Sequence, residues 1–418
     1  MRKCDCDCSW FLALAMTTCL FLLLVSPATA GTILTKYSPD GEQLWVVADD
    51  SREGDPEATV FLDPYGDVFV HQLDYVAKYD SEGVELWRYD AEFFQTAMDS
   101  EGSLYLPCGR HCIGKRDRDG VALWKRNLGQ RIPYAMVADA WDNLLLFTYS
   151  DNASEQIIKF TPDGELLWTF DFYASGDVDA GTNIGSLCVD NQGDFYFYAV
   201  RQGQGGIARF DSEARLVWRA EFPDLFPEFI ALDTERNIFV ASEGEYNGNL
   251  LPGASFAVAK TDSNGQRVWT KFHDWWPGSD YGSSVEGVSV TPDGGFAAVG
   301  FAGGWATIVY APNGEELWAA QLSNTEAVPQ AMTVDQDGNV ISVGYSCTCG
   351  KEDLACCEMV IAKYSADGTM EWGTTYDHPA DDRDQASGVA TDEEGNIYVV
   401  GRYGYPDDDL DEETGCGC

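Results

Sequence analysis

The residues of this chain whose types could do chemistry are its cysteines and its few histidines. Thirteen cysteines occur among 418 residues, and four of them fall within the first thirty. The remaining nine include the short motif CGRHC, from Cys108 to Cys112, and a cluster within SCTCGKEDLACCE, from Ser346 to Glu358. Disulfides, metal ligation and redox chemistry are the three uses to weigh for thiols at such spacings.

Disulfides are the favoured use of these thiols. A zinc site requires a further His or Cys pair at finger-like spacing, and His111 within CGRHC has none downstream. Cys188 stands alone in the apolar run GSLCVD, so we expect it to be the unpaired, buried thiol. We predict disulfides, with their connectivity left open, among Cys108, Cys112, Cys347, Cys349, Cys356, Cys357, Cys416 and Cys418.

Motifs for catalysis or metal binding are missing from the sequence. It contains four histidines and no GxSxG, HExxH or phosphate-cradling glycine loop. DRDG at Asp117 and DQDGN at Asp335 look like calcium loops, but they lack the D-x-D-x-D-G spacing with a distal glutamate. We therefore expect turn roles for both segments, no catalytic residue, no metal and no cofactor, with calcium as the alternative.

A segment rich in aromatic residues, HDWWPGSDYG, runs from His273 to Gly282 and belongs to no repeat. Adjacent tryptophans beside proline and glycine can stack on a sugar ring or grip a peptide. We therefore take His273, Trp275, Trp276 and Tyr281 as the candidate ligand-binding residues. The alternative is that these rings fold back over the rim of the domain.

The charge of the chain excludes two classes of partner. Asp and Glu total 69 against 26 Lys and Arg, for a formal net charge of −43 that is spread along the sequence. Such a surface repels nucleic acid and anionic membranes. A soluble extracellular or salt-adapted surface explains it, and an acidic face for a basic partner is the alternative.

Both ends of the chain differ from its middle. Arg2 and Lys3, an apolar run from Trp10 to Val25 and the small residues of SPATAG predict a secretory signal over residues 1–30. The alternative is a retained anchor. We expect an exported, soluble monomer, periplasmic or extracellular, whose folded part spans residues 31–404. The acidic tail over residues 405–418 is expected to be disordered.

Two short phrases alternate along the middle of the chain. The first, KYSPDGEQLW from Lys36, recurs eight times with Lys or Arg nine residues before the tryptophan, except where Val309 stands. Its glycine supplies the positive φ of a tight hairpin turn, and Ala214 replaces it once. The phrases end at Trp45, Trp87, Trp124, Trp168, Trp218, Trp269, Trp318 and Trp372.

The second phrase, such as DEEGNIYV from Asp392, also predicts a hairpin and also occurs eight times. Asp142 and Arg236 replace its glycine in two copies, and Thr291 begins another. One phrase of each kind makes a four-stranded antiparallel unit, and a unit of 40–50 residues is typical of a β-propeller blade.

The sequence therefore predicts an all-β, eight-bladed propeller, with seven blades as the alternative. The first tryptophan phrase and the last aspartate phrase each lack a partner, so they should complete one blade together. The repeated tryptophans should lie on the outermost strands and pack against the neighbouring blade. Tight turns should occupy one face and the variable connections the other, which makes the second face the place to look for function.

The segments DQASGVATDEEGNIYVVG (Asp384–Gly401) and Asp335–Trp372 resemble the bacterial β-propeller-repeat (SBBP) family. More loosely, the glycine-to-tryptophan spacing resembles the docking motif of quinoprotein-like propellers. That second resemblance would imply a vicinal disulfide between Cys356 and Cys357 on a quinone, but the chain is too short and lacks the calcium ligands, so pyrroloquinoline quinone is not expected.

These observations lead to a functional expectation. The chain is expected to be a non-catalytic scaffold that binds a protein, peptide or glycan through the variable face or the central channel. The alternative is an exported enzyme, either a polymer hydrolase or lyase or a quinoprotein-like oxidoreductase.

Overall fold

The computed structural model describes most of the chain between residues 30 and 404. Within the described residues every regular element is a strand, so no helix is long and apolar enough to cross a membrane. The internal segments outside the description are 52–56, 91–94, 151–152, 172–186, 202–203, 223–224, 226–228, 244, 247–248, 251–255, 274–283, 302–303, 323–326, 348–356 and 379–382.

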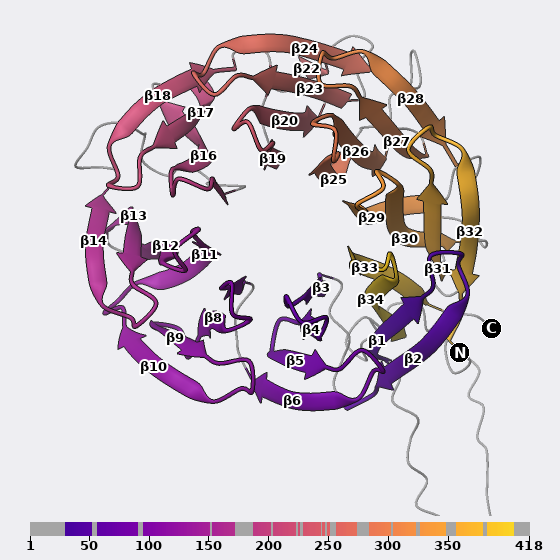
Figure 1. Ribbon diagram of the computed structural model, residues 1–418, viewed down its shortest axis with the longest axis horizontal. Coiled ribbons are helices and arrows are strands. Elements are labelled where there is room, and N and C mark those ends of the chain that lie inside the picture. Colours follow the sequence, from indigo (N-terminus) through magenta and orange to yellow (C-terminus); the bar gives the residue numbers. More distant parts are fainter. Residues whose placement is uncertain are drawn as a thin grey trace, which may run out of the picture.

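Eight four-stranded antiparallel sheets form a closed ring (Figure 1). Blade 1 consists, from the inner to the outer strand, of β3 (Thr59–Leu62), β4 (Val68–His71), β5 (Tyr75–Tyr79) and β6 (Glu85–Asp90). Blade 2 consists, in the same order, of β7 (Ala97–Met98), β8 (Leu104–Pro107), β9 (Cys112–Arg116) and β10 (Ala122–Asn127). Blade 3 consists of β11 (Ile132–Ala138), β12 (Leu144–Ser150), β13 (Ala153–Phe160) and β14 (Leu166–Asp171). Blade 4 consists of β15 (Leu187–Val189), β16 (Phe195–Arg201), β17 (Gln204–Phe210) and β18 (Leu216–Glu221).

The second half of the ring repeats this order. Blade 5 consists of β19 (Phe229–Leu232), β20 (Ile238–Glu243), β23 (Phe256–Thr261) and β24 (Arg267–His273). Blade 6 consists of β25 (Ser284–Val290), β26 (Phe296–Phe301), β27 (Trp305–Tyr310) and β28 (Glu316–Gln321). Blade 7 is β29 (Ala327–Val334), β30 (Val340–Cys347), β31 (Cys357–Tyr364), β32 (Met370–Tyr376). A small hairpin, β21 (Glu245–Tyr246) and β22 (Asn249–Leu250), extends from blade 5.

Blade 8 closes the ring with strands from both ends of the chain. Its order is β33 (Asp384–Thr391), β34 (Ile397–Gly404), β1 (Ala30–Tyr37), β2 (Gln43–Asp49). β1 and β34 are antiparallel in unbroken register, from the Ala30–Gly404 pair to the Tyr37–Ile397 pair. The predicted eight blades and the shared closing blade are therefore confirmed.

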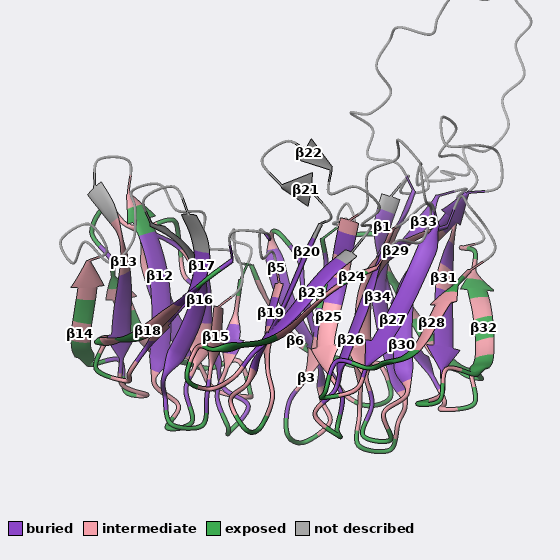
Figure 2. Cartoon of the chain, turned by 90° about the horizontal axis from the view of Figure 1, so that it is seen from above, coloured by how far each residue is buried: buried purple, intermediate pink, exposed green. Residues whose placement is uncertain are grey.

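The hairpin turns of all eight blades lie on one face, which we call the turn face, as at 38–42 and 63–67 (Figure 2). The opposite face, which we call the loop face, carries the connections within and between blades, as at 72–74. The three turn residues that replace the repeat glycine still adopt its left-handed conformation, with φ of 61–66° at Asp142, Ala214 and Arg236. The turn therefore keeps the same backbone conformation where another residue replaces the glycine.

The core lies between blades, because each sheet buries both of its faces against its neighbours. Between blades 3 and 4, Phe147 and Ile157 pack against Phe195, Phe197 and Phe210, all almost completely buried. The repeat tryptophans lie on the outermost strands as predicted. Each donates its Nε1–H to a turn carbonyl of the next blade at 2.8–3.2 Å, with Ser81, Arg118, Pro162, Ser212, Ser263, Pro312, Ala366 and Pro39 as acceptors.

Candidate functional site

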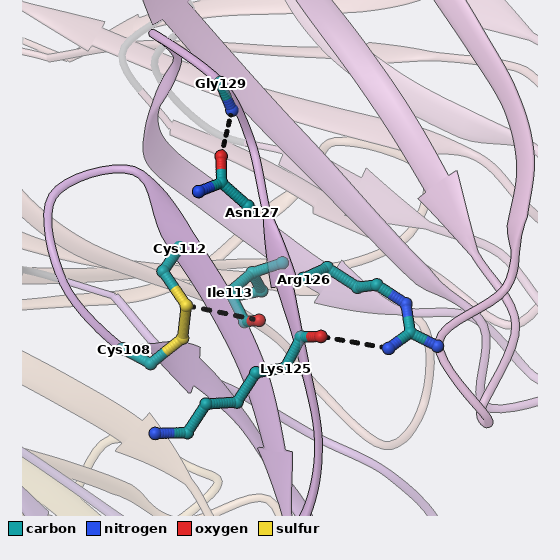
Figure 3. Close-up of a disulfide and its surroundings, with 7 residues drawn as sticks. All are labelled: Cys108, Cys112, Ile113, Lys125, Arg126, Asn127 and Gly129. Carbon is teal, nitrogen blue, oxygen red and sulfur yellow. Dashed lines mark hydrogen bonds between the residues drawn. A yellow bond between two sulfur atoms is a disulfide. The ribbon is translucent and has the colours of Figure 1, made fainter.

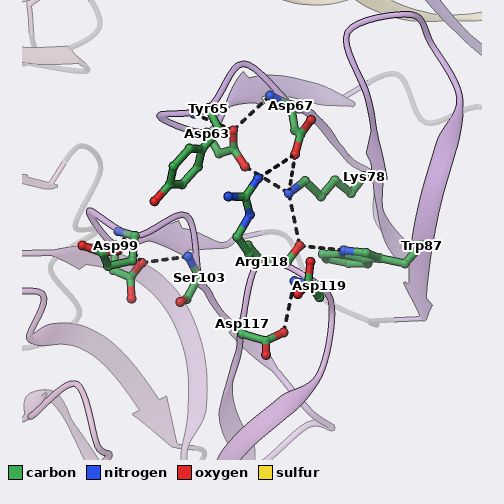
Figure 4. Close-up of polar contacts among 11 residues, drawn as sticks. Asp63, Tyr65, Asp67, Lys78, Trp87, Asp99, Ser103, Asp117, Arg118 and Asp119 are labelled. Carbon is green, nitrogen blue, oxygen red and sulfur yellow. Dashed lines mark hydrogen bonds and ion pairs between the residues drawn. The ribbon is translucent and has the colours of Figure 1, made fainter.

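The turn face contains a buried polar network that recurs in several blades, and Figure 4 shows it around Lys78 of blade 1. In blade 1 the Lys78 ammonium lies 3.0 Å from Asp63 Oδ2 and 2.8 Å from Asp67 Oδ2. It also donates to Arg118 O at 3.1 Å, the same carbonyl that accepts from Trp87. The lysine therefore joins the two hairpins of its own blade to the turn of the next blade.

The same arrangement explains why Lys or Arg precedes the tryptophan. Further ion pairs join Lys115 to Asp99, Lys159 to Asp139, Arg209 to Asp194 and Lys260 to Asp233, at 2.6–3.4 Å. Blade 6 contains both exceptions at once, since Val309 replaces the cation and Thr291 replaces the carboxylate. Sequence reasoning gave the lysine no role, although this paired replacement within one blade was a readable signal.

Both segments that look like calcium loops serve as turns. Asp117 Oδ1 accepts from the backbone N–H groups of Asp119 and Val121 at 3.1 and 2.8 Å. Asp335 Oδ1 makes the equivalent pair of bonds, at 3.0 and 2.8 Å. Among the described residues, no three His, Cys, Asp or Glu side chains are grouped so that they could hold a metal ion.

Two disulfides lie at the loop-face ends of their hairpins. Cys108 bonds to Cys112 where β8 leads into β9 (Figure 3), and Cys347 bonds to Cys357 across β30 and β31. Cys357 is thereby committed, so the vicinal pair with Cys356 that a quinoprotein would imply is wrong. Of the other predicted disulfide cysteines, Cys349, Cys356, Cys416 and Cys418 lie outside the described residues.

Cys188 on β15 is a free thiol, as predicted, although the residue is partly rather than fully buried. Its Sγ lies 3.2 Å from Ile230 O in the next blade. Burial raises the pKa of the Cys188 thiol to about 12. The thiolate needed for nucleophilic or redox chemistry is therefore scarce at neutral pH.

Of the predicted ligand-binding residues, the structure describes only His273. This residue ends β24, the outermost strand of blade 5, and its Nδ1 lies 3.2 Å from Glu316 Oε2 of blade 6. Trp275, Trp276 and Tyr281 lie outside the described residues. His273 is thus on the outer rim of the ring, away from the innermost strands.

A cleft of about 300 Å³ lies between blades 1 and 2, at the loop-face ends of their innermost strands. Its polar wall consists of Thr59, His71, Gln95 and Thr96, and its apolar wall consists of Phe61 and Met98. Only His71 is buried among its polar residues, with 5% of its surface exposed. Among the described residues, no carboxylate, lysine or arginine lines the cleft.

Sequence reasoning missed His71, because it directly follows a repeat phrase and belongs to no motif of its own. His71 pairs with Val76 on β5, two residues before the repeat lysine. The residues in the same register of the other seven blades are uncharged and mostly apolar: Pro107, Phe147, Tyr198, Ala241, Val299, Val343 and Val400. The imidazole therefore departs from the repeat at an interface between blades.

Comparisons with known proteins agree with this architecture. Residues 153–360 match the family described as outer membrane protein assembly factor BamB, and residues 380–402 match the β-propeller repeat family. The resemblance to SBBP repeats, and more loosely to quinoprotein-like propellers, is thus confirmed. No curated protein matches the chain.

Solved structures similar to this chain share its fold at low sequence identity. The C-terminal WD40 domain of Sif2 is 10% identical with a TM-score of 0.57, over 83% of this chain and 96% of that one. The dihydro-heme d1 dehydrogenase NirN is 11% identical with a TM-score of 0.56, over 90% and 75%. The Dos1 propeller is 10% identical with a TM-score of 0.51, over 68% and 79%. At these identities the likeness concerns the fold alone.

Proposed function

We propose that this chain, whose repeats resemble those of the SBBP family, is an exported, non-catalytic propeller that binds a protein, peptide or glycan through its loop face. The observation that carries this proposal is the unequal use of the two faces. Turn-face carboxylates, cations and indoles are consumed in the network that fastens blade to blade. In the described residues this network does not extend to the loop face, where the cleft beside His71 lies.

Export is supported by chemistry that suits an oxidising compartment. The Cys108–Cys112 and Cys347–Cys357 disulfides persist outside the reducing cytosol. The BamB and SBBP resemblances are compatible with a periplasmic or extracellular location.

The test compares the two faces with matched aromatic substitutions. The full chain is immobilised and offered to glycan and peptide arrays, with Trp275→Ala/Trp276→Ala as the loop-face variant. Tyr65→Ala/Trp141→Ala is the control, because both rings are exposed on the turn face. We expect the loop-face variant to reduce capture at least tenfold and the control to leave it unchanged. Loss of capture in the control alone would place the binding surface on the turn face and refute the proposal.

A further inference from the structure

We infer that the cleft between blades 1 and 2 is a binding site for a neutral saccharide unit, an inference that rests on the proposed binding function. Its volume is near the lower end of the roughly 300–1,000 Å³ typical of small-molecule sites. It therefore suits one sugar ring, or the end of a longer chain, rather than a large cofactor.

The apolar wall of the cleft has the geometry that sugar rings use. Phe61 is stacked on Phe69 with ring centroids 5.4 Å apart and the planes 4° from parallel. One face of the Phe61 ring is therefore covered, and its partly exposed side lines the cleft beside Met98. The C–H face of a pyranose can pack on such a fixed aromatic surface.

The polar wall offers hydrogen-bonding groups in a number that a sugar can satisfy. Gln95 supplies an amide, Thr59 and Thr96 supply hydroxyls, and His71 supplies an imidazole. A sugar presents several hydroxyls that both donate and accept, whereas one peptide side chain meets only one or two of these groups. Since the described lining residues include no carboxylate, lysine or arginine, a neutral saccharide fits them better than an ionic ligand.

Two short segments of blades 1 and 2 border this cleft. The connection between β4 and β5 is only Gln72–Asp74, and the Gln72 backbone N–H donates to Tyr75 O at 2.9 Å. Its side-chain amide donates to Thr32 Oγ1 of blade 8 at 2.7 Å, which fixes the short connection. On the other side, β7 contains only two residues, so Gln95 and Thr96 precede the strand and border the cleft.

The equivalent position in another blade shows which residue can replace His71 and fill the cleft. Phenylalanine stands at the position of His71 in blade 3, where Phe147 is completely buried between blades. His71→Phe should therefore fold while it removes the imidazole and occupies the space of the ligand. Gln95→Ala is a second variant, and because Gln95 is exposed its loss should leave folding intact.

The experiment measures binding of neutral saccharides to the full chain by saturation-transfer NMR and titration calorimetry. The probes are glucose, galactose, mannose, N-acetylglucosamine and their disaccharides, with neutral and basic peptides in parallel. Phe272→Ala is the control, because Phe272 is an exposed ring on the outermost strand of blade 5. We expect Kd to rise at least tenfold in His71→Phe and in Gln95→Ala and to stay unchanged in the control.

Each other outcome has a distinct meaning. Saccharide binding that is equally tight in both cleft variants would overturn the assignment of this site. Capture of peptides but of no saccharide would overturn the ligand class and leave the proposed binding function standing. Failure of every glycan and peptide to bind the unaltered chain would refute both.

Discussion

Neutralising one buried ion pair of the turn face should show how strongly the polar network fastens the ring. In blade 3, Lys159 Nζ lies 2.9 Å from Asp139 Oδ2, and the two side chains are only 4% and 0% exposed. At an effective dielectric constant of about 20, this separation corresponds to a gross attraction of about 6 kcal/mol. Removing one partner leaves the other charge buried, which typically costs about 3–5 kcal/mol.

We expect Lys159→Met and Asp139→Asn each to destabilise the fold by about this amount. Asparagine keeps a side-chain oxygen that can accept from the turn N–H groups of Trp141 and Asn143, both 2.9 Å from Asp139 Oδ1. The double variant contains no buried charge at this place, so it should be about 2–3 kcal/mol more stable than the sum of the single effects predicts. Blade 6, with Thr291 and Val309, already contains an uncharged pair here.

Differential scanning calorimetry is the assay. With about 2.1 cal/mol/K of unfolding entropy per residue over roughly 370 residues, 1 kcal/mol shifts Tm by about 1.3 °C, so each single variant should lose about 4–6 °C. The exposed pair Arg215–Asp211, 3.6 Å apart, is the control, and Arg215→Met/Asp211→Asn should change Tm by less than about 1 °C. Strict additivity of the two buried substitutions would refute the coupling.

Three further predictions test other parts of the fold. Gly164→Ala places a methyl group 2.6 Å from the docked indole of Trp124. Gly66 also has a positive φ, but a methyl group there meets nothing within 4 Å, so Gly164→Ala should lower Tm more than Gly66→Ala. Because its pKa is raised, Cys188 should resist alkylation at pH 8 in the native state, as measured by mass spectrometry of its peptide. The raised pKa should also stabilise the fold until the pH exceeds about 9, and this contribution should fall as the pH rises towards 12. Thr307 Oγ1 and Ser342 Oγ are buried without a hydrogen-bond partner in the described structure, so Thr307→Val/Ser342→Ala should raise Tm by about 1–4 °C, and a fall instead would indicate a water that both hydroxyls bind.

The ring could be predicted from the sequence because each blade repeats the same local chemistry. The turn glycines, the tryptophan at a fixed distance and the two unpaired phrases at the ends determine strand order, blade number and closure. The structure adds the partner of each repeated residue. The lysine before each tryptophan was visible in the sequence, but its contact with the turn carbonyl of the next blade depends on how the blades are placed in space.

The candidate site could not be predicted in the same way. Phe61 and His71 flank a repeat phrase and Gln95 lies between two phrases, so no motif singles them out; they come together because blades 1 and 2 are adjacent in the ring. Sequence reasoning instead favoured the aromatic segment after His273, since paired tryptophans are conspicuous. That segment lies outside the described residues, so its role remains the prediction made for the loop face.

Departures from the repeat differ in whether the chain compensates for them. Val309 and Thr291 change together within one blade, so that blade contains neither charged residue of the repeated ion pair. Polar Thr307 and Ser342 stand where the equivalent residues of all the other blades are apolar. His71 differs from both, because it borders a cleft whose polar wall includes Gln95 and Thr96 of blade 2.

A polar side chain at a packed interface between blades loses contact with water, so its partners in the protein or in a ligand must satisfy its hydrogen-bonding groups. A repeat fold tolerates such a residue where it serves something other than packing. His71 borders the cleft on the loop face, together with Gln95 and Thr96. Replacing His71 with the phenylalanine of blade 3 should therefore leave the ring folded and raise the Kd for a saccharide at least tenfold, and an unchanged Kd would remove His71 from the binding site.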